Sequence, residues 1–181
     1  INICYNKFIE TKVGEIMELV YQKARDFLAR YPGTIAWRVK AHCKIAEKLI
    51  NDDEEILYVF AAQKGPSALD IFSTHVIVFT NKRLVVAQKR LIFGYLYYSI
   101  TPDLFNDFNI SMGLIWARAT IDTVKETVIL SNVSKGAVRE IETVITKYMM
   151  QKKRELETEV TDQERQELHS ELNKISKEGE H

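Results

Sequence analysis

The chain has 181 residues, of which 46% are hydrophobic and 10% aromatic, so disorder throughout is excluded and one well-packed core with an appendage is expected. Its 25 basic and 25 acidic side chains give no formal net charge, which excludes non-specific binding of nucleic acid or anionic membrane through a global basic field. No run of about 18 apolar residues occurs, so no membrane-spanning helix is predicted. Cys4 and Cys43 are too few for a disulfide-stapled secreted scaffold, which favours a cytoplasmic location.

The amino-terminal part of the chain shows the period of two amphipathic helices. Apolar residues recur every three or four positions from Val13 to Tyr31, and Pro32-Gly33 then ends this first helix. A second stripe of the same period runs from about Ile35 to Ile50, and the turn-forming residues Asn51-Asp52-Asp53 follow it. Residues 1–53 are therefore predicted to form a helical hairpin.

The middle of the chain carries seven runs of strand-forming residues, separated by short turn signals. Connections this short cannot hold crossover helices, so an antiparallel and roughly sequential sheet that curls toward a small barrel or sandwich is predicted. The predicted strands are Glu55–Lys64, Ile71–Phe79, Leu84–Gln88, Phe93–Ile100, Leu104–Ser111, Leu114–Ile121 and Val124–Leu130.

The carboxy-terminal part returns to helical periodicity. Ser134 is predicted to cap a helix whose apolar side packs on the sheet. Past Gln151 the sequence becomes charged, and Thr161 with Glu164 predicts a capping box that starts a separate terminal helix. Residues 151–181 are thus predicted to form a charged helical arm with a narrow apolar seam, made of Leu156, Val160, Leu168, Leu172 and Ile175.

Short sequence motifs at the predicted turns give a family resemblance. They are Thr80-Asn81-Lys82-Arg83-Leu84, Tyr98-Ser99-Ile100-Thr101-Pro102-Asp103, Gly113-Leu114-Ile115-Trp116-Ala117, Ile121-Asp122-Thr123 and Leu130-Ser131-Asn132-Val133. With these motifs, residues 54–150 resemble the bacterial pleckstrin-homology (PH)-like family of the YokE-like type. The resemblance implies an α+β fold, in which a seven-stranded antiparallel barrel or sandwich is capped by a C-terminal helix. It also implies a soluble, often oligomeric and non-enzymatic protein.

A mouth of basic residues is predicted at one end of the sheet. The turns after strands one, three and six are expected to meet there, which brings together Lys64, Lys89, Arg90 and Lys125. Such a group would bind an anion or a lipid headgroup by charge-assisted hydrogen bonds. Solvated lysines that discourage strand aggregation are the competing interpretation. In the eukaryotic relatives, headgroups are bound by bases on the first loop and second strand, whereas here the second strand opens on Asp70 and carries no base.

No catalytic, cofactor-binding or metal-binding constellation is predicted, and the protein is not expected to be an enzyme. The chain contains no GxSxG, Walker, HExxH or GxGxxG pattern. The four histidines are scattered, and His42 and Cys43 point about 100° apart as neighbours on a helix. Nucleic-acid binding is not predicted either, because acids rather than bases are interleaved with the aromatic residues of strands four and five.

The predicted function is that of an interaction module, which acts through contacts with an unidentified protein partner and through self-association into a homo-oligomer. The apolar seam of the arm carries the self-association, since it has too few apolar neighbours to form a core by itself. The alternative is weak peripheral contact with anionic lipid. It would use the mouth residues or a second basic group, made of Lys147, Lys152, Lys153 and Arg154.

Overall fold

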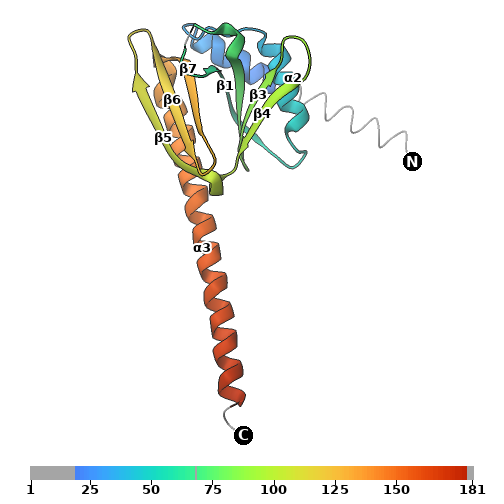
Figure 1. Ribbon diagram of the computed structural model, residues 1–181, viewed down its shortest axis with the longest axis vertical. Helices are drawn as coiled ribbons and strands as arrows, with labels where there is room; N and C mark the ends of the chain where they lie inside the picture. The colour runs from blue at the N-terminus through green and yellow to red at the C-terminus, as the bar shows by residue number, and fades with distance from the viewer. Residues whose placement is uncertain (1–18, 68, 179–181) are drawn as a thin grey trace, which may run out of the picture.

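The computed structural model describes residues 19–67 and 69–178. Two amino-terminal helices lie on a curled sheet, and a long carboxy-terminal helix runs past the sheet and projects beyond it (Figure 1). The predicted first helix is helical over its described part, residues 19–30, and residues 13–18 lie outside the described residues. The second helix, α2 (Val39–Leu49), begins later than predicted.

The late start of α2 has a physical cause in the linker that precedes it. The amide side chain of Asn132 binds both backbone groups of Ile35, with Nδ2 2.5 Å from the carbonyl oxygen and Oδ1 3.3 Å from the nitrogen. The Trp37 nitrogen donates to Thr74 Oγ1, and Arg38 has a left-handed backbone with φ 54°. These contacts hold the linker extended against the sheet, so the helical pattern from Ile35 to Arg38 does not become helix.

The sheet has seven antiparallel strands in the order β4-β3-β2-β1-β7-β6-β5. Consecutive strands pair except β4 and β5, which leaves an open half-barrel, and β1 pairs with β7 only at Gln63 and Lys64. The predicted antiparallel, nearly sequential and curled sheet is therefore confirmed. The strands are β1 (Ile56–Lys64), β2 (Thr74–Thr80), β3 (Leu84–Lys89), β4 (Tyr95–Ile100), β5 (Phe105–Met112), β6 (Trp116–Thr123) and β7 (Thr127–Ser134).

Side-chain hydrogen bonds at the turns explain why some strands begin later than predicted. Asp70 accepts from the Phe72 nitrogen at 3.2 Å and caps a short 3-10 turn, η1 (Ile71–Ser73), ahead of β2. The hydroxyl of Thr123 accepts from the backbone nitrogens of Lys125 and Glu126, which delays the start of β7 to Thr127. Another 3-10 turn, η2 (Pro102–Leu104), links β4 to β5.

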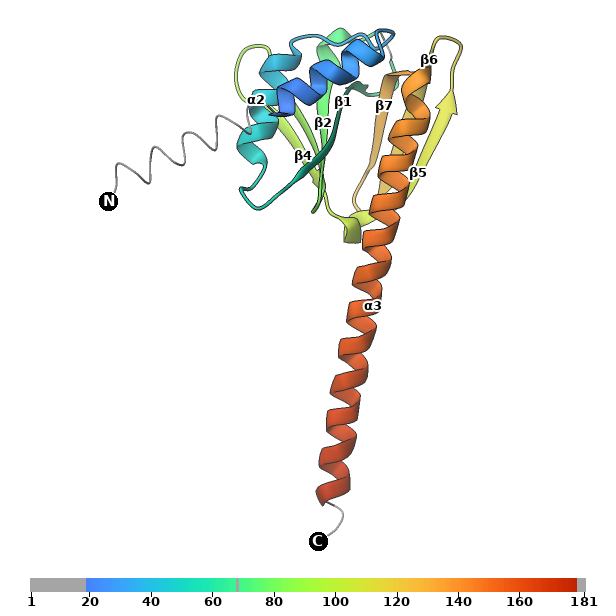
Figure 2. The same cartoon turned by 180° about the vertical axis from the view of Figure 1, so that it is seen from behind.

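Two apolar layers cover the two faces of the β1–β4 part of the sheet. The inner layer joins both halves of the sheet to the buried side of the carboxy-terminal helix, with Phe60, Phe105 and Ile141 among its fully buried members. The outer layer packs α2 and the helix of residues 19–30 against the other face, around Cys43 and Val78. Figure 2 shows both helices lying across the sheet beside the carboxy-terminal helix.

A buried ion pair ties α2 to the sheet. Arg83 Nη2 lies 2.7 Å from Glu54 Oε1, and the Glu54 side chain is fully buried. Arg83 also donates to the Leu49 carbonyl, the last residue of α2, and to the Tyr97 hydroxyl. Burial raises the pKa of Glu54, but the hydrogen bonds from Arg83 and Thr80 outweigh it, so the pKa lies below its ordinary value.

The carboxy-terminal helix, α3 (Val138–Glu178), is continuous over 41 residues. The predicted cap is wrong, because Ser134 makes no side-chain cap hydrogen bond and a 3-10 turn (Lys135–Ala137) precedes the helix. The predicted capping box is also wrong, because Thr161 lies inside the helix and donates to the Glu157 carbonyl. The predicted boundary between domain and arm therefore falls within a single helix. None of the described helices combines the length and apolar character needed to cross a membrane.

Candidate functional site

Lys64, the first residue of the predicted basic mouth, points into the half-barrel. Its Nζ lies 3.3 Å from the centre of the Tyr98 ring, a cation–π contact that joins the end of β1 to β4. The same atom lies 3.8 Å from Glu126 Oε2, in the turn between β6 and β7, and the lysine side chain is 21% exposed. Lys64 is thus held by partners within its own chain and is poorly available to an external anion.

Lys89 and Arg90, two other residues of the predicted mouth, lie far from the fourth residue, Lys125. Lys89 and Arg90 lie where β3 ends, whereas β3 begins at Leu84, which pairs with Ile100 beside η2. The turn that contains Lys125 lies at the η2 end, because the Val124 nitrogen donates to the Leu104 carbonyl at 2.9 Å. Figures 1 and 2 show the β3–β4 loop at the top and the β6–β7 turn at the bottom. The prediction of one common mouth is wrong, because successive turns of an antiparallel sheet alternate between its two ends, which places the turn after the sixth strand opposite the turn after the third.

Three loops at the top of the half-barrel expose apolar side chains that the sequence interpretation assigned to strands or passed over. The β3–β4 loop presents Ile92 and Phe93, which are 75% and 84% exposed, and the β5–β6 loop presents Leu114, which is 93% exposed. We call this surface the loop end, made of Leu69, Phe72, Leu91, Ile92, Phe93, Met112, Leu114 and Ile115. An apolar run at the tip of a hairpin resembles strand sequence, so periodicity alone could not reveal it.

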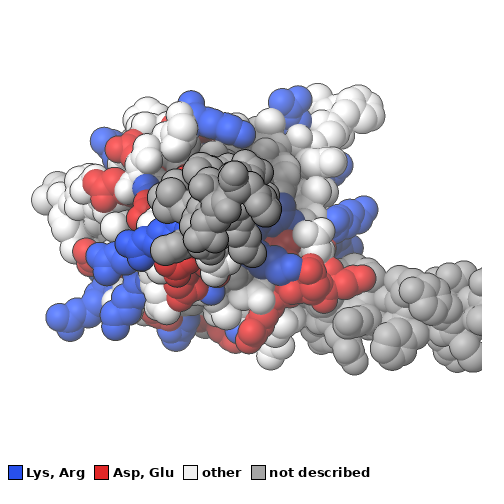
Figure 3. Space-filling model, turned by 90° about the horizontal axis from the view of Figure 1, so that it is seen from below, with Lys and Arg blue, Asp and Glu red and all other residues white. Residues whose placement is uncertain are grey.

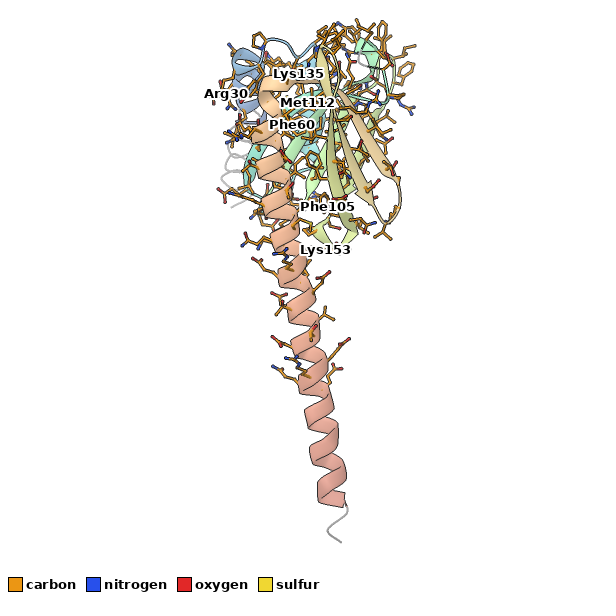
Figure 4. The ribbon with its side chains drawn as sticks, turned by 90° about the vertical axis from the view of Figure 1, so that its left-hand side faces the viewer. Arg30, Phe60, Phe105, Met112, Lys135 and Lys153 are labelled. Atoms are coloured by element: carbon orange, nitrogen blue, oxygen red, sulfur yellow. The ribbon has the colours of Figure 1, made fainter. Side chains whose placement is uncertain are left out.

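The arm is the part of α3 that extends beyond Lys153. Lys153 Nζ donates to the Phe105 carbonyl at 3.0 Å and is the last residue of the helix with a described bond to the sheet. Below the level of η2, the side chains drawn on the helix have no other element beside them (Figure 4). Two residues of the predicted seam, Leu156 and Val160, are 40% and 53% exposed and line a groove of about 400 Å³ against Asp103 of η2. Leu168, Leu172 and Ile175 lie farther along α3.

The second basic group does not mark the end of a helix. Lys147, Lys152, Lys153 and Arg154 all lie inside α3. Lys152 forms an ion pair with Glu155 at 2.7 Å, and Lys153 donates a hydrogen bond to the Phe105 carbonyl. Seen from below, along the arm, acidic and basic side chains are interspersed (Figure 3). This surface has no single sign of charge that would direct it to an anionic membrane.

The buried side chains of His42, Cys43 and His75 have the environments of structural residues. Burial lowers the pKa of His42 to about 4, and its Nδ1 accepts from the Lys89 nitrogen at 2.9 Å. Burial also raises the pKa of the Cys43 thiol to about 12, which leaves it unreactive at neutral pH. Burial lowers the pKa of His75, whose Nδ1 contacts the Ser73 carbonyl. Within the described part of the chain, no group of His, Cys, Asp or Glu side chains could hold a metal ion.

The fold agrees with what a comparison with protein families finds. Residues 50–147 match the family model described as the bacterial PH domain, and this stretch is more than half of the chain. The chain belongs to the bacterial PH domain family. Its seven-stranded curled sheet with a carboxy-terminal helix is the PH-like fold, and PH domains are generally non-catalytic modules. The YokE-like type stays a prediction.

Two solved structures of PH domains are similar to this protein. One is a DUF1696 family protein with a pleckstrin-homology domain from Shewanella loihica PV-4, with 16% identity over 56% of this chain and 87% of that chain and a TM-score of 0.41. The other is a pleckstrin homology domain from Shewanella amazonensis SB2B, with 19% identity over 57% of this chain and 90% of that chain and a TM-score of 0.42. No curated protein matches the chain.

Proposed function

We propose that this bacterial PH domain protein is a non-enzymatic interaction module of the cytoplasm that assembles with copies of itself through the arm of α3. The observation that carries the proposal is a helix that continues for about 25 residues beyond Lys153, with Leu156 and Val160 exposed on the part of it nearest the sheet. Most helical stability in proteins comes from packing of an apolar face, and the described structure places nothing against the arm beyond η2. A helical partner would supply that packing.

The apolar positions of the arm fall into two groups, which lie on different sides of α3. Leu156 and Val160 continue the side of α3 that is buried against the sheet at Ile145 and Met149, since the successive spacings are four, seven and four residues. Position 168 comes eight residues after Val160, so at 3.6 residues per turn it is displaced by about 80° around the helix. The pair Leu156 and Val160 and the group of positions 168, 172 and 175 therefore need separate tests.

The experiment is a mass measurement by light scattering on three matched variants of the full chain. One replaces Leu156 and Val160 with Ser, and the second replaces Leu168 and Leu172 with Ser. The third, Glu159→Ser with Asp162→Ser, is the control, because it inserts serine at two exposed positions of the same helix. We expect the control to keep the wild-type mass and at least one apolar variant to fall to the monomer. A monomeric wild-type protein, or wild-type mass in both apolar variants, would overturn the proposal.

A further inference from the structure

The three apolar loops form one surface, because hydrogen bonds join them side by side. Gln88 Nε2, at the end of β3, donates to the Phe72 carbonyl in the β1–β2 loop at 2.6 Å. Arg118 Nη2, at the start of β6, donates to the Pro66 carbonyl of that same loop at 2.9 Å. The β1–β2 loop thus connects the β3–β4 loop to the β5–β6 loop, and Figures 1 and 2 both show the three loops at the top of the half-barrel.

The side chains of the loop end project away from the fold. The Gly113 nitrogen donates to the Trp116 carbonyl, so Leu114 and Ile115 occupy the corner of a tight turn. The Arg90 nitrogen donates to the Gly94 carbonyl, and the residues between them form the tip of the β3–β4 loop. None of the eight loop-end side chains belongs to either apolar core layer. Turn corners are ordinarily occupied by Gly, Pro, Asn, Asp or Ser, so folding does not account for apolar residues there.

The turns at the opposite end of the sheet are polar, which makes the molecule asymmetric. The β2–β3 turn contains Asn81 and Lys82, and η2 contains Asp103. Among the residues that the structure describes, Val124, which is 65% exposed, is the one large apolar side chain at an exposed turn of that end. Polar residues therefore suffice to form the turns of this sheet, and the apolar tips are confined to one end.

Basic side chains surround the apolar tips with little to neutralise them. Lys89, Arg90, Arg118 and Lys135 lie on or beside the three loops, against the single acid Asp70. Lys135 Nζ donates to the Leu114 carbonyl, a neutral partner that leaves the positive charge uncompensated. Among the described residues, none of these four basic side chains forms an ion pair.

We propose that the loop end is a membrane-contact surface whose apolar tips insert into the interface of a bilayer that contains anionic lipid. Apolar tips that enter the headgroup region and basic side chains that stay at its surface are the two contributions that hold a peripheral protein on such a bilayer. The tips protrude from separate hairpins, and a hollow of about 360 Å³ separates the β5–β6 loop from Pro66 in the β1–β2 loop. A fluid lipid surface can close around such tips, whereas a rigid protein partner would have to match each of them.

This membrane contact goes beyond self-association through the arm, and it differs from headgroup capture in a basic pocket. Lys64 is occupied by Tyr98 and Glu126, and Lys125 lies at the opposite end of the sheet. Insertion needs neither residue. The arm leaves the molecule at the end opposite the loop end, so a bound protein would direct it away from the bilayer (Figure 1).

The test is flotation of the full chain with vesicles of phosphatidylcholine alone or mixed with phosphatidylserine, at low and physiological salt. Two variants remove the tips, Ile92→Ser with Phe93→Ser and Leu114→Ser with Ile115→Ser. Val124→Ser is the matched control, because it removes an exposed apolar side chain from the other end. We expect each tip variant to bind mixed vesicles at least about tenfold more weakly than wild type, and the control to bind normally.

A second measurement reports insertion directly and does not depend on loss of binding. With Trp37 and Trp116 replaced by Phe, so that the introduced indole alone emits, vesicles should shift the emission of a Leu114→Trp variant to the blue, and lipids brominated along their chains should quench it more strongly than with Val124→Trp. Three results would overturn the proposal: no flotation in any condition, binding lost at physiological salt but unaffected by the tip substitutions, or equal quenching at both positions. The second of these would show electrostatic contact alone. A wild-type protein that is monomeric yet still floats would leave this proposal standing while the arm proposal falls.

Discussion

At the scale of single residues, the carboxyl group of Glu47 is buried, and its neighbours only partly offset the cost of ionising it. The residue is 7% exposed on α2, and neither carboxylate oxygen has a hydrogen-bond partner. Burial raises its pKa from 4.5 to about 7, although Lys44 acts in the opposite direction. Because the pKa of the folded state lies above that of the unfolded state, the protonated group is compatible with folding at low pH. The cost of ionising it appears as the pH rises from about 4.5 to 7.

Replacing Glu47 with Gln should remove this cost. We expect Glu47→Gln to be more stable than wild type by about 1 to 3 kcal/mol above pH 7, and the two proteins to have equal stability below about pH 4.5. Urea unfolding across this pH range measures the difference in the free energy of unfolding. Glu142→Gln, at an exposed position of α3, is the control and should follow wild type throughout. Parallel stability curves for wild type and Glu47→Gln would contradict the account.

These residue environments were not predictable from the local pattern. The spacing of Val39, Cys43 and Ala46 indicates the buried stripe of α2, and Glu47 lies beside it at a position that a charged residue commonly occupies. Whether its carboxylate meets water depends on the helix of residues 19–30, which packs on the same outer layer. The Arg83–Glu54 pair likewise joins positions 29 residues apart in sequence. Local periodicity carries no information about such long-range partners.

At the scale of elements, α3 shows why a capping pattern can mislead. A capping box starts a helix only where the preceding residues are not helical. Here Gln151 and Lys152 both donate to Glu155 one turn on, and these pairs support helix through the charged stretch. Nothing in that stretch ends the helix, so Thr161 becomes an interior residue. The periodicity predicted the existence of helix on both sides correctly, and only the break was wrong.

A proline at position 161 should separate the arm from the rest of the molecule. Thr161→Pro removes the backbone donor and clashes with the carbonyl of Glu157, which costs about 3 kcal/mol in a helix interior. Because Thr161 is exposed and lies two turns beyond Lys153, we expect lower helical ellipticity but an unchanged thermal midpoint for the sheet and its core. Thr161→Ala is the control and should keep full ellipticity. A lower midpoint in the proline variant would show that the arm supports the folded core.

At the scale of the whole molecule, the order of elements was sufficient to predict the sheet but not its ends. Short turns force sequence neighbours to pair, which fixes most of the strand order. The β4–β5 splay and the short β1–β7 contact depend on how the sheet curls around Phe60 and Ile141, and the turn sequences do not encode this. The position of Lys125 opposite Lys89 and Arg90 has a simpler cause, because successive turns of an antiparallel sheet alternate between its two ends, and the predicted strand order already implied this.

The two ends of the molecule suggest a joint prediction about assembly and membrane contact. A chain that ends at Arg154 keeps Lys153 and the buried residues Ile141, Ile145 and Met149, so it should stay folded, with a thermal midpoint within a few degrees of wild type. Without the arm it should be monomeric. An assembly presents several loop ends to one vesicle, so the truncated chain should bind mixed vesicles at least about tenfold more weakly, through loss of multivalency.

Residual binding of the truncated chain decides how the two ends are related. If the loop end alone contacts lipid, the remaining binding should disappear when Leu114 and Ile115 are also replaced with Ser, and it should persist with Val124→Ser. Equal binding by the full and truncated chains would mean that assembly does not contribute to membrane affinity. Complete loss on truncation would instead place the lipid contact on the arm, where interspersed acidic side chains such as Glu155 and Glu159 oppose it.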